Sequence, residues 1–254
     1  MKNLYQQLKS DQNNARLIEQ SHTYVINGEK YCRLSATALL NYCMFLEKGQ
    51  KPVKWLIAEQ QLENDSAKNI EMTKGLEIAM KNGDRIHHIL EKGQYDETAP
   101  ENVKKFIDKS VKHDHDINND EMCLKEVIIW TENLVGSIDL ITFKNDRIII
   151  ADYKTSNFIK DKKEKYFLQL KIYAYMISKK YKVPINKIDL QIIWLPRKFS
   201  SNFEVFTTIM SPTDTYKIIE MYKKVQKNAD KLREIEFLYL KDNAFPYIIT
   251  DWIN

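Results

Sequence analysis

The spacing of hydrophobic residues changes along the chain near Cys123. Before this point, apolar residues recur every three or four positions, which is typical of amphipathic helices. The pattern predicts helices over residues 35–47, 53–62, 66–92 and 101–112. Ser35 is the expected N-cap of the first helix, and Asn82-Gly83 marks a potential break in the third.

From Cys123 onward, β-branched residues dominate and predict strands. Three successive strands are expected at EVIIWT, LVGSIDLITF and RIIIADYKT. They are followed by a helix over 160–182, strands over 188–195 and 203–210, and a last helix over 212–235. The aromatic-rich tail, 236–254, is expected to pack against the rest of the protein. This order predicts an α/β (α+β) fold with a mixed central sheet flanked by helices.

Length and composition fit one compact structural domain. The chain has 254 residues, of which 43% are hydrophobic, and it contains only six glycines and six prolines. It can therefore bury a sizeable core and lacks the composition of long flexible linkers. Within this domain we expect an N-terminal helical region over 1–120 and a strand-rich core over 121–254.

The sequence predicts a protein of the cytoplasm. No window approaches eighteen consecutive apolar residues, and the polar start, MKNLYQQLKSDQNN, lacks the apolar core of a signal peptide. The three cysteines, Cys32, Cys43 and Cys123, have no CxxC spacing, which argues against a disulfide framework and a zinc or iron–sulfur cluster. The Lys/Asn/Ile-rich composition favours a bacterial or phage-infected cell.

The net charge of +4 is too small to identify a nucleic-acid partner, but the lysines are unevenly distributed. They cluster at 160–165, 179–182 and 223–231. Each cluster taken alone is most simply a solvated helix face. Near a functional site, the same clusters could neutralise backbone phosphates.

Three acidic residues fall into register across the three neighbouring strands. A turn centred on Asn145-Asp146 makes paired residues sum to 291 and sets Asp139 opposite Asp152. A turn centred on Glu132-Asn133 makes pairs sum to 265 and sets Glu126 opposite Asp139. Lys154 shares the face of Asp152, because residues two apart on a strand point the same way.

Carboxylates that oppose each other directly are destabilising unless a cation lies between them or one of them gives up its charge. A hard divalent ion with oxygen ligands, such as Mg²⁺, meets this need and leaves positions open for water and phosphate oxygens. Two alternatives stay open. The acids could lie spread on a wet sheet face, or a turn centre could be wrong by one residue, which would reverse the face.

The segment Asp152-Tyr153-Lys154 follows the apolar run Ile148–Ile150, which is typical of a buried central strand. Charged residues at the end of such a strand are costly to bury unless they are used or paired. A simple Asp–Lys ion pair is one interpretation. In the other, the carboxylate holds a metal while the ammonium orients an attacking water and stabilises charge on a phosphate.

Two weaker signals flank the strands. Upstream, GDRIHHILE places two histidines on a helix about 100° apart, so only one of them can face a given site. Downstream, Gln169 and Tyr173 are four residues apart and share one helix face. They could hydrogen-bond the site or a DNA phosphate.

The ordered segments GDRIHHILE, GSIDLI, IIIADYKTS and QLKIYAY resemble those of PD-(D/E)XK nucleases, in particular the RecB-type branch with phage and mitochondrial genome maintenance exonucleases. The resemblance spans roughly residues 75–195 and implies a restriction-endonuclease-like core. It implies one or two Mg²⁺ or Mn²⁺ ions as cofactor. It also implies a site made of the residues His87, Glu126, Asp139, Asp152, Tyr153, Lys154, Gln169 and Tyr173.

The resemblance also implies a role for each residue. His87 would be a metal ligand or site organiser, with His88 as the fallback. Asp139 and Asp152 would bind metal, and the Tyr153 carbonyl could add a ligand. Lys154 would be the catalytic lysine, whereas the role of Glu126 varies within the family. Gln169 and Tyr173 would match the motif that follows the core strands.

The implied activity is hydrolysis of DNA phosphodiester bonds that leaves a 5′-phosphate, more often by an exonuclease than by a sequence-specific cutter. The chain lacks the cysteine cluster of the iron–sulfur relatives and the GxxxxGK[ST] motif, so a helicase or recombination partner would be a separate protein. The rival interpretations are a structure- or site-specific endonuclease, an inactive DNA-binding scaffold, and a hydrolase of other phosphoesters. Aromatic residues that could stack on bases, or equally pack in the core, are Tyr42, Phe45, Trp55 and Tyr95.

Overall fold

The computed structural model describes the chain except for residues 19–22, 63–66, 117–121, 198–201 and 241–254. The helices are α1 (Lys2–Gln12), α2 (Ala36–Lys48), α3 (Val53–Leu62), α4 (Ala67–Lys92), α5 (Glu101–Asp116), α6 (Lys163–Tyr181), α7 (Pro212–Lys227) and α8 (Ala229–Leu240). The strands are β1 (Ala15–Ile18), β2 (Thr23–Ile26), β3 (Glu29–Lys30), β4 (Leu34–Ser35), β5 (Met122–Trp130), β6 (Leu134–Lys144), β7 (Arg147–Lys154), β8 (Ile188–Trp194) and β9 (Glu204–Ile209). The predicted packing of the tail falls largely on 241–254, outside the described residues.

The central sheet is mixed, as the sequence predicted. Its order is β4-β6-β7-β8-β9, and β5 pairs with β6 as well. β5, β6 and β7 are antiparallel neighbours, β7 and β8 run parallel, and β9 is antiparallel to β8. The parallel pair needs a crossover connection, which α6 supplies.

Both predicted hairpin turns are confirmed. Asn145 and Asp146 have φ angles of 49° and 55°, the positive values of a type I′ turn, which matches the twist of the strands. The pairs between β6 and β7 sum to 291, as in Leu140↔Ala151. The pairs between β5 and β6 sum to 265, as in Val127↔Ile138.

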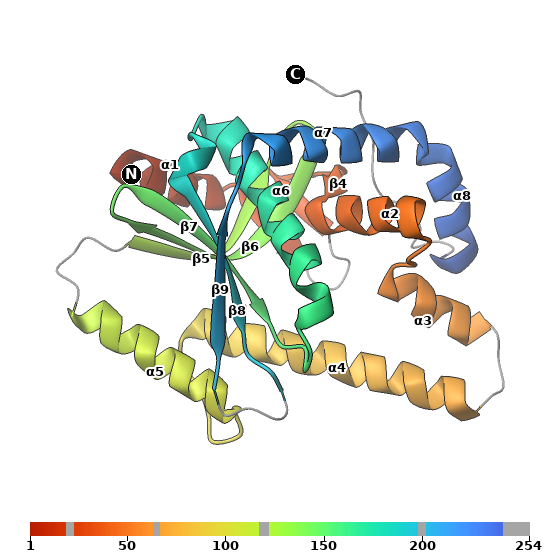
Figure 1. The fold of residues 1–254 in the computed structure, drawn as a ribbon, viewed down its shortest axis with the longest axis horizontal. Helices are drawn as coiled ribbons and strands as arrows, with labels where there is room; N and C mark the ends of the chain where they lie inside the picture. Colours follow the sequence, from red (N-terminus) through yellow and green to blue (C-terminus); the bar gives the residue numbers. More distant parts are fainter. Residues whose placement is uncertain (19–22, 63–66, 117–121, 198–201, 241–254) are drawn as a thin grey trace.

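Helices cover both faces of the sheet (Figure 1). One face packs on α2, α6 and α7, around buried residues such as Leu39, Ile172 and Tyr222. The other face packs on α4 and α5 through Ile86 and Val103, among others. The sheet therefore has two apolar sides, and a polar site can open only at a strand end or a gap between strands.

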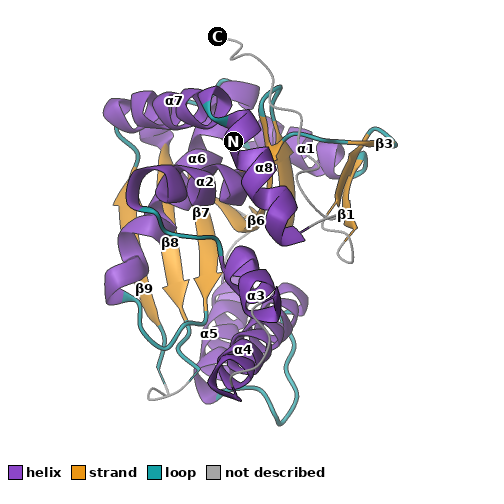
Figure 2. Cartoon of the chain, turned by 90° about the vertical axis from the view of Figure 1, so that its right-hand side faces the viewer, coloured by secondary structure: helices purple, strands orange, loops and turns teal. Residues whose placement is uncertain are grey.

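The N-terminal region differs in part from the expected helical pattern. A small sheet in the order β1-β2-β3 lies apart from the central sheet (Figure 2). Its Tyr24 and Ile26 form a separate small core with Ile128 and Val135 of the central sheet. β4 joins the central sheet directly and leads into α2, whose predicted N-cap is confirmed, because Ser35 Oγ accepts the amide of Ala38 at 3.0 Å.

Two predicted helix boundaries are wrong. α4 continues through Asn82-Gly83, because one glycine costs a helix only about 1 kcal/mol and the buried residues Ile86 and Leu90 hold this helix on the sheet. The expected last helix is two helices, separated at Asn228, which leaves the helical conformation (φ −108°, ψ 17°). None of the described helices is long and apolar enough to cross a membrane.

Candidate metal and catalytic site

The candidate site lies at a gap along one edge of β6. On one edge, β5 follows this strand over almost its whole length. On the other edge, β4 pairs with Leu134 and Val135, and β7 pairs only from Leu140 onward. Within the part of the chain that the structure describes, no strand pairs with the stretch between them, residues 136–139, on that edge. Asp139 therefore sits directly beyond the last pair of the β6–β7 ladder.

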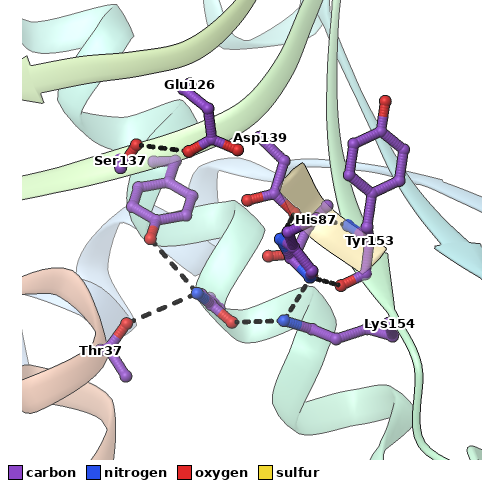
Figure 3. Close-up of polar contacts among 10 residues, drawn as sticks. Thr37, His87, Glu126, Ser137, Asp139, Tyr153 and Lys154 are labelled. Atoms are coloured by element: carbon purple, nitrogen blue, oxygen red, sulfur yellow. Dashed lines mark hydrogen bonds and ion pairs between the residues drawn. The ribbon is translucent and has the colours of Figure 1, made fainter. Parts of the chain in front are cut away.

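The backbone of Tyr153 shows how the two strands separate. Its N–H and C=O pair with no backbone group of β6, and side chains of the site residues take that place (Figure 3). The N–H donates to Asp139 Oδ2 at 2.7 Å, and the C=O lies 3.1 Å from His87 Nε2. Buried backbone groups need partners, so these contacts fix both side chains relative to β7.

His87 projects from α4 into this gap, and its surroundings define its tautomer. A carbonyl oxygen can only accept, so Nε2 carries the proton and donates it to Tyr153. The other ring nitrogen, Nδ1, points toward the carboxylates and lies 3.6 Å from Asp139 Oδ2. This arrangement is common for metal-binding histidines, in which one nitrogen is held by a carbonyl and the other binds the ion. His88 points elsewhere, toward Glu91, with 61% of its side chain exposed.

Glu126 faces the same gap from β5. Its φ of 48° lies in the left-handed region, which costs energy for a residue other than glycine. The ladder keeps its register on both sides, from Lys125↔Leu140 to Val127↔Ile138, so Glu126 occupies the position facing Asp139. Ser137 Oγ donates to Glu126 Oε2 at 3.3 Å. The register argument thus placed Glu126 correctly beside Asp139. The predicted pairing of Asp139 with Asp152 is wrong, because the β6–β7 ladder ends at Leu140↔Ala151.

The electrostatics of the cluster are unfavourable when it holds only protein atoms. Burial, followed by the charges of Asp139 and Glu91, raises the pKa of Glu126 to about 7. Burial and the neighbouring charge of Asp152 likewise raise the pKa of Asp139, although His87 and Lys154 oppose the shift. A cation among these carboxylates would therefore be favourable, because its charge offsets both their burial and their mutual repulsion.

Asp152 and Lys154 form the second half of the site. Lys154 Nζ lies 2.5 Å from Asp152 Oδ2 in a pair that is almost fully buried. Burial alone would lower the pKa of Lys154, but the charges of Asp152 and Asp139 outweigh it and raise this pKa, so the side chain remains an ammonium group. Asp152 Oδ2 is buried and, among the described residues, accepts no hydrogen bond of regular geometry besides this ion pair.

A short hydrogen-bond chain links the lysine to α6 and α2. Gln169 Oε1 lies 3.3 Å from Lys154 Nζ, and the Gln169 amide donates to Tyr173 Oη at 3.2 Å and to Thr37 Oγ1 at 3.5 Å. Tyr173 packs against Gly136, where a Cβ would come within 2.6 Å of its ring. Gln169 and Tyr173 thus support the lysine from behind. Sequence reasoning missed Thr37, because no local signal brings the first turn of α2 to this position.

The residues present fit a divalent cation. Ligand atoms of His87, Glu126 and Asp139 lie within 4.8 Å of one another. Two atoms on opposite sides of an ion that binds at about 2.1 Å are about 4.2 Å apart, so side-chain shifts of a few tenths of an ångström close the cluster. Carboxylate oxygens suit Mg²⁺ and Mn²⁺, and the imidazole favours a transition metal such as Mn²⁺. Asp152 Oδ2 lies beside this cluster rather than in it.

The aromatic residues considered for base stacking are mostly structural. Tyr42 and Trp55 are buried, and Phe45 packs edge-to-face on Trp55. Tyr95 is 40% exposed, and its hydroxyl donates to Asp108 at 2.8 Å. Their packing role is confirmed for Tyr42 and Trp55.

Comparisons with solved structures give distant likenesses. SSO0001 is 12% identical, with a TM-score of 0.39, over 95% of this chain and 93% of its own. An alkaline exonuclease, LHK-Exo from Laribacter hongkongensis, is 11% identical, with a TM-score of 0.33, over 74% of this chain and 91% of its own. The complex of LHK-Exo with dAMP is 10% identical, with a TM-score of 0.28 and the same coverage.

Among curated proteins, none matches the sequence. A family model does match, and it covers residues 82–242, which is more than half of the chain. The matched segment contains the part of α4 that carries His87, the three strands of the site, and α6. This chain belongs to the PD-(D/E)XK nuclease superfamily.

Proposed function

We propose that this protein is a Mg²⁺- or Mn²⁺-dependent deoxyribonuclease, an exonuclease that acts on DNA ends or single strands and leaves 5′-phosphates. The observation that carries the proposal is the gap along β6, where Glu126, Asp139 and Asp152 converge beside a buried ammonium group. A set of carboxylates that repel one another has no structural benefit. Such a set is suited to binding a cation, which in turn binds a phosphate.

His87, Glu126 and Asp139 would hold the ion, and Asp152 would add an oxygen ligand from the neighbouring strand. When bound, Mg²⁺ or Mn²⁺ supplies Lewis acidity to the phosphate and to the attacking water. The Tyr153 carbonyl already accepts from His87, and its remaining lone pair could serve as a further ligand. In this proposal Tyr153 acts mainly by fixing His87 and Asp139.

Lys154 stays protonated, so it serves as a hydrogen-bond donor and a positive charge rather than as a base. Its position beside Asp152 lets it orient the attacking water and stabilise the negative charge that develops on the phosphate. Gln169 holds this ammonium group in place, and Tyr173 in turn holds Gln169. Such support limits the reorganisation needed during the reaction.

A nuclease assay on end-labelled linear DNA, single-stranded and duplex, with a closed circular control tests the proposal. With Mg²⁺ or Mn²⁺, we expect mononucleotides from linear DNA and an intact circle. Cutting of the circle would instead indicate an endonuclease. DNA binding without any hydrolysis would support the inactive scaffold. Hydrolysis of small phosphoesters but not of polymers would indicate a different hydrolase.

A further inference from the structure

One large aromatic side chain stands out near the site. Phe158 is 75% exposed, although it follows Lys154 by only four residues. Four residues span at most about 14 Å, so this ring lies within reach of a strand whose phosphate occupies the site. Single exposed apolar residues are normal on protein surfaces, so exposure alone does not decide the matter.

The backbone that carries Phe158 is held firmly. Trp194 Nε1 donates to the Ser156 carbonyl at 2.6 Å, and Arg197 Nε donates to the Thr155 carbonyl at 3.1 Å. Ser156 Oγ donates to the carbonyl of Phe158 itself at 3.0 Å. On the other side, Ile159 is buried in the main core. The ring is therefore presented to solvent by a segment anchored at both ends.

Positive charge continues from the site along the first turns of α6. Lys162 immediately precedes α6, and Lys165 and Gln169 follow it at spacings of three and four residues within the first two turns of the helix. Gln169 touches the catalytic lysine, and Lys165 Nζ donates to Asn41 Oδ1 of α2 at 3.0 Å. Lys162 to Gln169 spans about 10 Å of helix, the length of about three nucleotides along a stacked strand.

These lysines are not neutralised. Burial, followed by the charges of Lys162 and Lys154, lowers the pKa of Lys165. Among the residues the structure describes, neither Lys162 nor Lys165 forms an ion pair. Two ammonium groups without a carboxylate partner among the described residues therefore lead toward the site, where Lys154 is paired with Asp152, and such a path suits a polyanion. A path that combines lysines with an exposed aromatic ring is typical of surfaces that bind single-stranded nucleic acid.

We propose that Phe158, Lys162 and Lys165 form a single-strand platform next to the site. An unpaired base of the substrate stacks on Phe158, and the two lysines bind phosphates of the same strand. This inference rests on the proposed function and narrows its substrate to a single-stranded end or overhang, because a paired base offers no free face to the ring.

The test measures binding apart from cleavage. Fluorescence anisotropy of labelled oligo-dT and of a blunt hairpin duplex is recorded in a chelator, so no hydrolysis occurs. We expect Phe158→Ala to weaken oligo-dT binding about tenfold and hairpin binding less than twofold, and Phe158→Trp to retain tight binding. Phe237→Ala is the matched control, since Phe237 is 63% exposed on α8. It should bind as the unmodified protein does.

The lysines are tested through salt dependence. Lys162→Gln and Lys165→Gln should each reduce the slope of log affinity against log salt by about 0.7, the value for one single-strand phosphate contact. Lys231→Gln, an exposed lysine on α8, should leave the slope unchanged. Unchanged slopes in the first two variants would overturn the phosphate contacts. Equal loss of hairpin and oligo-dT binding in Phe158→Ala, or no loss at all, would overturn the stacking.

The same proteins separate this inference from the proposed function. If the unmodified protein with Mn²⁺ hydrolyses oligo-dT while Phe158→Ala changes neither its affinity nor its KM, the platform is wrong and the nuclease stands. If Phe158 governs binding but Mn²⁺ produces no nucleotides, the platform stands and the hydrolysis is wrong.

Discussion

Buried carboxylates occur in two regions of this protein, and their surroundings differ in kind. Glu236 of α8 is fully buried where α8 meets α2 and α3, and it is surrounded by donors. Tyr42 Oη donates to it at 2.8 Å and Trp55 Nε1 at 3.3 Å, while Lys54 Nζ lies 2.6 Å away. In the gap along β6, by contrast, buried carboxylates face other carboxylates.

The comparison shows that burial of a charge does not by itself indicate function. The surroundings of Glu236 compensate for its lost hydration, so this acid stabilises the packing of three helices. The acids of the gap are compensated only in part, by Lys154 beside Asp152 and by the Tyr153 amide on Asp139, and they also repel one another. This leaves an electrostatic demand that a bound cation would meet. That demand, rather than burial, distinguishes a site from a structural element, and the following experiments test the distinction.

The largest effect is expected on activity. Asp152→Asn removes one charge with almost no change of shape, and we expect cleavage to fall about a thousandfold or more, which is about 4 kcal/mol in activation free energy. Lys154→Ala should have a comparable effect. Rates are measured on end-labelled DNA with Mn²⁺. Glu236→Gln is the control and should keep most of its activity, whereas retained activity in Asp152→Asn would refute the assignment of the site.

The second effect concerns stability, which we expect to depend on Glu236 although activity does not. Glu236→Ala leaves the buried donors of Tyr42 and Trp55 without this acceptor, and we expect it to lower the free energy of unfolding by about 3 kcal/mol. Glu234→Ala, an exposed acid on the same helix, should change it by less than about 0.5 kcal/mol. Denaturant unfolding measures both. Equal stability of the two variants would remove the structural role given to Glu236.

Metal binding should stabilise only one of the two regions. At a Mn²⁺ concentration of a hundred times Kd, linkage raises the free energy of unfolding by about 2.7 kcal/mol. This gain should be largely lost in Asp139→Asn and kept in Glu236→Gln. Tm with and without Mn²⁺ provides the measurement, and EDTA should reverse the gain. If Mn²⁺ did not change the Tm of the unmodified protein, the result would contradict the metal site.

The smallest effect is a gain of stability in the metal-free protein. The folded state raises the pKa of Glu126 to about 7, so between about pH 4.5 and 7 it binds more protons than the unfolded state, and stability falls as pH rises through this window. Glu126→Gln removes this penalty. Allowing for solvent screening of a partly exposed group, we expect the variant to be about 1 kcal/mol more stable at pH 8 and equal at pH 5.

This gain is measured as Tm in EDTA at several pH values. Mn²⁺ should reverse the order at pH 8, because the variant loses a ligand. A variant that is less stable than the unmodified protein at pH 8 without metal would show that Glu126 stabilises the fold rather than opposing it.

Much of the site could be predicted because its strands are joined by tight turns. The Asn-Asp pair sets a type I′ turn, and the turn fixes the register for every residue of β6 back to Leu140. What the sequence did not reveal is that β7 leaves β6 directly after Leu140. The other part of that edge is taken by β4, which is about a hundred residues away in the chain, so no local pattern reveals the gap between the two.

Other features were missed for equally physical reasons. The helix break at Asn228 carries no glycine or proline, so local chemistry gives no warning. The small sheet of β1 to β3 consists of strands of four residues or fewer, too short for a clear alternation of hydrophobic and polar residues. Phe158 could not be singled out, because a hydrophobic residue in a sequence does not reveal whether it will be buried.

The hydrogen bond from the Tyr153 amide to Asp139 has a consequence for spectroscopy. Most amides in β-sheets bond to backbone carbonyls, whose charge does not change, whereas this one bonds to a carboxylate. The nitrogen-15 resonance of Tyr153 should therefore shift whenever Asp139 gains a proton or a cation. This single NMR signal could thus report whether a cation occupies the gap, and the protein would need no added dye.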